Sequence, residues 1–222
     1  MRELSSRLST IQALIPQGVR VADIGTDHAH LPISLIKSGR CPFVIASDIK
    51  EKPLKNAEQN IKKTNTENID LRLGSGLSTV QPEEVDCIVI AGMGGEVISS
   101  ILADTPWVKD CRYELILQPV TSADFLRKYL CDNGFKILTE TAVSENDKLY
   151  TVMKVVFFGE YILKSEAYYR IGEMKYDTDE SKKYIDKQIA IVKKCISDLK
   201  KANHESEILR FKNLLCEMEK CI

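Results

Sequence analysis

Residues that could do chemistry are densest in the stretch DIGTDHAHLP, which occupies Asp23–Pro32 directly after an apolar run. One glycine, two histidines and two aspartates in ten residues are compatible with a metal site, an acid–base triad or a cofactor loop. A metal needs third and fourth ligands, and the remaining histidine, His204, lies far along the chain. The hydrolase pattern G-x-S-x-G is absent from the sequence. We therefore expect no metal, and we expect a cofactor loop in which Gly25 lets the backbone approach the ligand.

Three more segments place similar residues at the ends of predicted strands. Asp48 ends the run FVIASD, and a carboxylate there can accept hydrogen bonds from ribose hydroxyls. Glycines recur in GSGL, residues 74–77, and in AGMGG, residues 91–95. Such glycines leave room for a ligand beside the backbone. Together these segments predict an adenosine-containing cofactor, and they do not separate S-adenosylmethionine from NAD.

The elements that must position these residues alternate between strand and helix, which predicts an α/β fold with a doubly wound parallel sheet. We expect strands near residues 19–24, 43–47, 69–73, 85–91 and 113–118. The helices between and around them are expected near residues 3–15, 32–37, 53–63, 96–102 and 123–131. Residues 135–143 and 148–158 flank Asn146-Asp147 and predict a closing antiparallel hairpin. A Rossmann-like sheet that ends in such a hairpin is typical of class I methyltransferases, and we assign it residues 1–160.

Residues 161–222 predict a helical coiled-coil appendage. Two apolar seams step alternately by three and four residues: Ile185, Ile189, Val192, Ile196 and Leu199, then Ile208, Phe211, Leu215, Met218 and Ile222. The seams are out of register, so we expect a break near residues 202–204 and two antiparallel helices. The seams could pack on the main domain or on a second subunit, or they could help to hold a large substrate.

The composition is that of an ordinary globular protein, with 222 residues, 44% hydrophobic residues and a net charge of −1. The seven cysteines form no CxxC pair, so zinc ribbons and thioredoxin-like sites are not expected. Their odd number, without a signal peptide, predicts reduced thiols in a cytoplasm. No apolar stretch is long enough to span a membrane. Nucleic-acid binding would need a local basic patch, because the chain as a whole is not basic. We expect a monomer or a weak dimer.

The motifs VADIGTDHAHLP, ASDI, GSGL, IAGMGGE and LILQP, preceded by LSSRLSTI, together resemble the bacterial tRNA (adenine-22-N1) methyltransferase family (TrmK). The resemblance covers about residues 4–158. It implies a class I methyltransferase that uses S-adenosylmethionine to methylate N1 of adenine 22 in the D-arm region of tRNA. AGMGG also stands where N6-adenine methyltransferases carry Asn/Asp-Pro-Pro-Tyr/Phe, so methylation of an exocyclic amine is not expected.

The resemblance also implies roles for individual residues. The cofactor's methionine side would contact Asp23, Gly25, Thr26, Asp27 and His28, and its ribose and adenine would contact Asp48, Ile49, Gly74, Ser75, Gly76 and Leu77. The transferring methyl group would lie over Ala91, Gly92, Met93 and Gly94, with Gln118 and Pro119 nearby. The candidates for catalysis are Asp23, His30 and Arg7. His30 departs from the family, whose members usually carry a tyrosine at that position.

Methyl transfer is an in-line displacement, so catalysis rests mainly on positioning and electrostatics. Asp23 or Asp27 could stabilise the positive charge that develops on the base. We expect Arg2, Arg7 and the lysines of the appendage to contribute to tRNA binding. Two alternatives are an NAD-dependent oxidoreductase and a non-catalytic RNA-binding protein on a methyltransferase fold.

Overall fold

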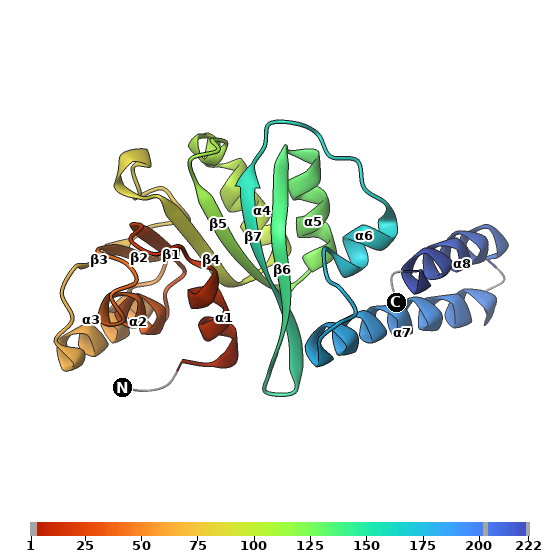
Figure 1. The fold of residues 1–222 in the computed structure, drawn as a ribbon, viewed down its shortest axis with the longest axis horizontal. Helices are drawn as coiled ribbons and strands as arrows, with labels where there is room; N and C mark the ends of the chain where they lie inside the picture. The colour runs from red at the N-terminus through yellow and green to blue at the C-terminus, as the bar shows by residue number, and fades with distance from the viewer. Residues whose placement is uncertain (1–3, 202–203, 221–222) are drawn as a thin grey trace.

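The computed structural model describes residues 4–201 and 204–220. Its centre is a seven-stranded sheet with the order β3-β2-β1-β4-β5-β7-β6, in which β7 alone runs antiparallel to both of its neighbours (Figure 1). The strands are β1 (Val21–Ile24), β2 (Val44–Asp48), β3 (Ile69–Leu73), β4 (Cys87–Gly94), β5 (Glu114–Thr121), β6 (Phe135–Glu145) and β7 (Lys148–Phe157). The predicted parallel sheet and its closing hairpin are therefore confirmed.

Helices cover both faces of this sheet. The helices of the first 160 residues are α1 (Ser6–Leu14), α2 (His30–Lys37), α3 (Glu51–Thr64), α4 (Gly95–Ala103) and α5 (Ala123–Asp132). Short 3-10 turns, η1 (Pro82–Glu84) and η2 (Pro106–Val108), lie in the connections that precede β4 and β5. Each predicted helix and strand of this region is present, with ends displaced by at most three residues.

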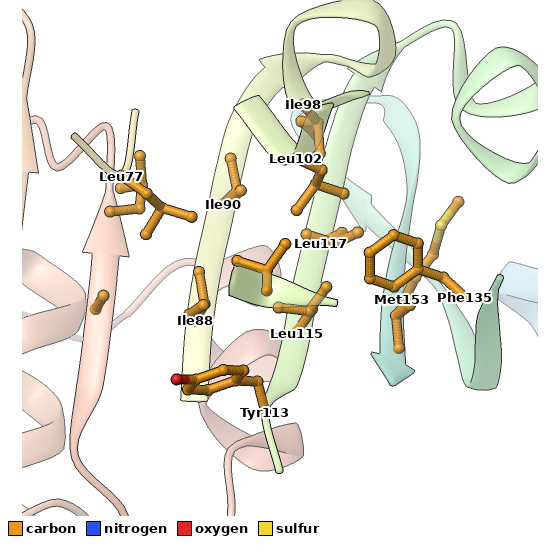
Figure 2. Close-up of a cluster of buried hydrophobic side chains, with 14 of the residues drawn as sticks. Leu77, Ile88, Ile90, Ile98, Leu102, Tyr113, Leu115, Leu117, Phe135 and Met153 are labelled. Carbon is orange, nitrogen blue, oxygen red and sulfur yellow. The ribbon is translucent and has the colours of Figure 1, made fainter. Parts of the chain in front are cut away.

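Alternation of side chains along the central strands builds two separate cores. Ile88 and Ile90 of β4 point with Leu117 of β5 toward Ile98 and Leu102 of α4 (Figure 2). The residues between them on the same strands face the other way and pack under α1 and α2. Burial on both faces explains why these strands read as continuous apolar runs.

The parallel strands end along one edge of the sheet. Asp23 of β1 is in register with Ala46 of β2 and with Val89 of β4. The loops that follow β1, β2 and β4 therefore emerge side by side, which is where ligands bind in open α/β sheets. The sheet thus brings together motifs that are separated by more than 60 residues in sequence.

The C-terminal region contains α6 (Glu166–Ile171), α7 (Asp179–Lys201) and α8 (Glu205–Glu219). The two apolar seams face each other in one buried cluster, and this cluster also includes Ala142 of β6 and Leu149 of β7. The helical hairpin thus packs both on itself and on the β6–β7 hairpin, as Figure 1 shows for α7. The expected break falls partly on residues 202–203, which lie outside the described residues, and Ile222 does so as well. Among the described helices, none is long and apolar enough to cross a membrane.

Helix α6 was not predicted, although its capping signals are present in the sequence. The Ser165 hydroxyl accepts a hydrogen bond from the Tyr168 backbone N–H at 3.3 Å, and Gly172 follows the helix with a φ of +73°. Helix α6 packs against α5 and contributes to the joint between the sheet and the appendage. The division of the chain at residue 160 remains a prediction.

That joint is a buried ion pair between Arg127 of α5 and Glu140 of β6, whose side chains are both completely buried. Arg127 donates to Glu140 at 2.7 Å, to the Tyr169 carbonyl at 2.8 Å and to the Tyr184 hydroxyl at 3.0 Å. Glu140 also accepts from the Glu173 backbone N–H at 3.1 Å. One ion pair thus ties the sheet to α6, to the turn after it and to α7.

Candidate functional site

A cavity of about 310 Å³ opens at the carboxyl edge of the sheet, where the loops after β1, β2 and β3 and the end of β4 meet one side of α4. Its walls combine glycines, a half-buried carboxylate and apolar side chains: Ile24, Gly25, Ser47, Asp48, Ile49, Gly74, Ser75, Gly76, Met93, Val97, Ser100, Ile101 and Asp104. The volume lies at the lower end of the range for small-molecule sites. Seven of the predicted cofactor-binding residues line this cavity.

Ile49 contributes an exposed apolar side chain to the cavity wall. Ile49 is 65% exposed, so its side chain offers an uncovered apolar surface directly beside the Asp48 carboxylate. Asp48 Oδ1 accepts a hydrogen bond from the Lys50 backbone N–H at 2.8 Å, which fixes the carboxylate at the end of β2. A polar group that can hold a ribose therefore lies next to an apolar surface that can hold an adenine.

The turn after β1 requires a glycine. Gly25 has a φ of +82°, and its N–H donates to the Ser47 carbonyl at 2.8 Å. A Cβ atom at this position would collide with the terminal methyl group of Met93. Ser47 also lines the cavity, and within the described residues its buried hydroxyl has no hydrogen-bond partner. An unsatisfied buried hydroxyl in a cavity wall is a group that a polar ligand can satisfy.

Asp23 lies in β1 beside this turn and is buried. The pKa of its carboxyl group is raised to about 6, mainly by burial. A hydrogen bond with Thr26 opposes this rise, and the neighbouring charge of Asp48 adds a smaller contribution to it. A carboxylate kept from water and not paired with a cation is costly to ionise. Asp23 is therefore suited to a ligand that brings positive charge to it.

The glycine-rich end of β4 contains a backbone irregularity at Gly92. The pairing of β4 with β5 shifts between Ala91 and Met93, and Gly92 has a φ of +77°. The Gly92 N–H donates to Gln118 Oε1 at 3.0 Å. Gln118 is completely buried and uses its amide nitrogen to donate to the Pro119 carbonyl at 2.8 Å. The side chain of Gln118 thus holds the bulge in place.

Arg7 of α1 reaches the same point from a distant part of the sequence. Its guanidinium donates to Gln118 Oε1 at 2.8 Å and to Glu145 Oε2 at 2.8 Å. It also lies over the ring of Tyr150, 5.3 Å from the centroid, and a Cβ atom on Gly92 would lie 3.6 Å from it. The Arg7 guanidinium is therefore fixed beside Gly92, where the resemblance places the transferring methyl group. We call this entrance beside Gly92 the mouth of the site.

Gly95 has a structural role that sequence reasoning did not separate from function. A Cβ atom there would collide with the Ser122 carbonyl oxygen, so Gly95 lets α4 begin close to the end of β5. Leu77 also has a packing role, because its side chain is buried in the same core as Ile90 and does not line the 310 Å³ cavity (Figure 2).

The two histidines of the opening motif lie together on the other side of the loop. Their rings are stacked, with centroids 5.4 Å apart, and the His28 Nε2 atom is 3.4 Å from an Asp27 carboxylate oxygen. Both line a groove of about 970 Å³ between α1, α2 and α3 and do not line the smaller cavity. Within the described residues no cluster of three or more His, Cys, Asp or Glu side chains could hold a metal.

The structure adds residues that the sequence did not single out. Ser47 lines the cavity, Glu145 and Tyr150 hold Arg7, and Val97 and Ser100 of α4 complete the cavity wall. The start of α4 directly after the glycine-rich loop could have indicated the last two. Nothing in the sequence indicates that the β6–β7 hairpin returns to Arg7. Arg2, expected to contribute to tRNA binding, lies outside the described residues.

Comparison with known proteins agrees with this arrangement. The tRNA (adenine(22)-N(1))-methyltransferase of Bacillus subtilis is 35% identical to the chain over 152 residues, which cover 68% of this chain and 64% of that protein. The crystal structure of the B. subtilis m1A22 tRNA methyltransferase TrmK has a TM-score of 0.85 and 27% identity, and covers 97% of this chain and 98% of its own.

A second solved structure is M. capricolum TrmK in complex with the cofactor product S-adenosyl-homocysteine, with a TM-score of 0.80 and 26% identity. That alignment covers 99% of this chain and 97% of the M. capricolum protein. Residues 4–153 match the family described as "Methyltransferase domain", which is more than half of the sequence. The resemblance noted in the motifs is therefore confirmed, and the chain belongs to the methyltransferase-domain family.

Proposed function

We propose that this protein transfers a methyl group from S-adenosylmethionine to N1 of an adenine in tRNA, the adenine at position 22 of the D-arm region. The observation that carries the proposal is the cavity at the carboxyl edge of the sheet, bounded by Asp48, Gly25 and Met93 and adjoining the Gly92 bulge. The similarity to TrmK proteins over nearly the whole chain supports both the donor and the acceptor.

The residues of the cavity fit this donor. Asp48 would accept hydrogen bonds from the ribose, Ile49 would cover the adenine ring, and Gly74 to Gly76 would allow the backbone to approach it. Asp23 would face the cationic methionine end together with Thr26 and Asp27, whereas His28 lines the neighbouring groove. When bound, S-adenosylmethionine supplies an activated methyl group on a positively charged sulfur.

At the mouth of the site, the chain provides positioning. The Gly92 bulge leaves no side chain between the cavity and the acceptor, and Gln118 fixes the bulge. We propose that Arg7 defines the entrance for the base and that His30 contacts the acceptor side. Adenine N1 carries its own lone pair, so the reaction needs no covalent intermediate on the protein. The base must leave its pairing partner, at a cost of a few kcal/mol.

The alternatives have less support. The antiparallel β7 between β5 and β6 is not required for a dinucleotide-binding sheet, and NAD-dependent oxidation is not favoured. A non-catalytic RNA-binding protein would not need a glycine bulge, an unsatisfied hydroxyl and a buried carboxylate in one place. A cytoplasmic location and a monomer or weak dimer remain part of the proposal.

The test is transfer of a labelled methyl group to unmodified tRNA, followed by mapping of the methylated nucleotide. We expect label at N1 of adenine 22, and we expect none on a tRNA that carries guanine at that position. Asp48→Ala should weaken S-adenosylmethionine binding and transfer together while the protein stays folded. Labelling at another base would overturn the assigned position, and tight NAD binding without S-adenosylmethionine binding would overturn the whole proposal.

A further inference from the structure

A second hollow of the described surface is distinct from the cofactor cavity. It has a volume of about 970 Å³ and lies between α1, α2 and α3. Its lining is polar at both ends and apolar in the middle: Leu4, Ser5, Leu8, His28, His30, Ile33, Ser34, Lys37, Asn60, Lys63 and Thr64. The proposed function gives His30 a contact with the acceptor and leaves the other residues of this groove without a role.

The groove follows α2 along its whole length. His30 is the first residue of α2 and Lys37 is the last, a rise of about 10 Å. The His30 end adjoins the loop that follows β1, and so it adjoins the proposed reaction site. The far end lies between Lys37 and Lys63, the latter on the last turn of α3. A chain that leaves the reaction site along α2 would therefore pass from the histidines to the lysines.

The charges in the groove are of one sign. The lining contains two lysines and two histidines and no acidic residue. Within residues 4–201 and 204–220, neither Lys37 nor Lys63 forms an ion pair, whereas Lys55 and Lys62 of the same helix α3 pair with Glu51 and Glu58. Unpaired ammonium groups beside a hollow are suited to phosphate, because binding there releases counterions without breaking an ion pair.

The other end of the groove is suited to a base. The rings of His28 and His30 are stacked on each other, so a base could extend this stack at its outer ring face, as imidazole and aromatic rings commonly do with unpaired RNA bases. Asn60 donates to the His28 carbonyl at 3.0 Å and holds α3 against this end. Leu8 and Ile33 provide an apolar floor between the two ends.

We propose that this groove binds the nucleotide next to the target adenine in the RNA strand, with its base toward His28 and His30 and its phosphate at Lys37 and Lys63. This inference rests on the proposed function and adds a site for a neighbouring nucleotide. The groove guides the strand along α2, so that the target base alone turns into the mouth beside Gly92.

The test compares the double variant K37A/K63A with K62A, a matched control on the same helix whose side chain lies outside the groove. Transfer kinetics on unmodified tRNA, equilibrium tRNA binding and S-adenosylmethionine binding are measured for each. K37A/K63A should weaken tRNA binding and raise KM for tRNA about tenfold at physiological salt, and should reduce the slope of log K against log salt by about 2. Its S-adenosylmethionine affinity and kcat should stay near wild type, and K62A should differ little from wild type in every measurement.

A crosslinking experiment locates the strand independently. A photoreactive group attached at Lys63→Cys should crosslink to nucleotides adjoining adenine 22, and the same group at Lys62→Cys should not. If the wild type methylates tRNA and K37A/K63A binds tRNA with unchanged affinity and salt dependence, the groove proposal is wrong while the proposed function stands. If the wild type transfers no methyl group to any tRNA, the proposed function fails and the groove proposal falls with it.

Discussion

At the scale of single residues, Asp23 is the group whose state depends most on the fold. Its ordinary pKa of 3.8 is raised to about 6, mainly by burial. A carboxyl group with a raised pKa stabilises the folded state fully below pH 4, and this contribution is lost as the pH rises through about 6. At neutral pH the folded protein without ligand therefore contains a destabilising buried charge, which a cationic ligand can compensate.

We predict that S-adenosylmethionine affinity increases about tenfold between pH 5 and pH 7, because only the ionised form of Asp23 favours a cationic ligand. Asp23→Asn should abolish this pH dependence and weaken binding at pH 7. Calorimetric titration at several pH values measures both effects. Asp27→Asn is the control, because that carboxylate is largely exposed, and it should keep the pH dependence.

Asp23→Asn, which should weaken ligand binding at pH 7, should make the ligand-free protein more stable. Because the pKa of Asp23 differs by about 2 between the folded and unfolded states, Asp23→Asn should increase the free energy of unfolding at pH 8 by up to roughly 3 kcal/mol. Near pH 4 the variant and the wild type should converge. Urea unfolding without ligand at the two pH values gives the comparison, and equal stabilities at pH 8 would show that Asp23 is not strained by burial.

At the scale of elements, α1 closes the mouth of the site through one side chain. Ile11 and Ile15 anchor the helix and the residue after it in the core, while Arg7 contacts β5 through Gln118 and the end of β6 through Glu145. The packing of the helix and the geometry of the mouth thus rest on different residues, and they can be altered separately.

We predict that Arg7→Ala lowers kcat at least tenfold with little change in S-adenosylmethionine affinity. Each charge-assisted hydrogen bond that is lost contributes about 1.5–3 kcal/mol to holding the mouth. Arg7→Lys should restore little of the lost kcat, because an ammonium group cannot donate to Gln118 and Glu145 with the planar geometry of a guanidinium. Steady-state kinetics and circular dichroism separate the loss of turnover from a loss of fold. Thr10→Ala on the same helix should leave kcat unchanged, since the exposed Thr10 hydroxyl donates to the Ser6 carbonyl of its own helix and, among the described residues, has no other hydrogen bond.

At the scale of the whole molecule, the buried pair of Arg127 and Glu140 decides how the appendage is attached. The pair links α5 and β6 to α6 and α7, and a Cβ atom on Gly172 would collide with the Glu140 carboxylate. The helical hairpin is therefore attached rigidly to the sheet. We expect sheet and appendage to unfold in a single transition, even though the sequence predicts two parts with a boundary at residue 160.

We predict that Arg127→Met destabilises the protein by about 3–5 kcal/mol, because it leaves the Glu140 carboxylate buried without a counter-charge. The matched control is Lys128→Met on the same helix, which should change stability little because its pair with Asp132 is exposed to solvent. Urea unfolding measures both. The double variant R127M/E140L should recover part of the loss, and a double variant as unstable as the sum of the single changes would contradict this account.

The sequence determined the order of elements because each strand and helix carries its own periodicity. It also placed Gly25, Asp48 and the glycine-rich loop at strand ends, since turns and buried strands have local signatures. The seams of α7 and α8 were readable for the same reason. Helix α6 was missed because a segment of six residues is too short to show a helical periodicity that distinguishes it from a loop.

Tertiary structure decided everything that depends on residues meeting across long separations. The pKa of Asp23 follows from its burial among neighbouring strands, and the distinction between Gly92 and Gly95 follows from what lies opposite each one. Arg7 meets Gln118 and Glu145 only because α1 crosses the edge of the sheet where the β6–β7 hairpin returns. The sequence by itself thus determined which residues end each strand. Only the packing of distant segments determined which residues line the same cavity or groove and which charged groups lie close together.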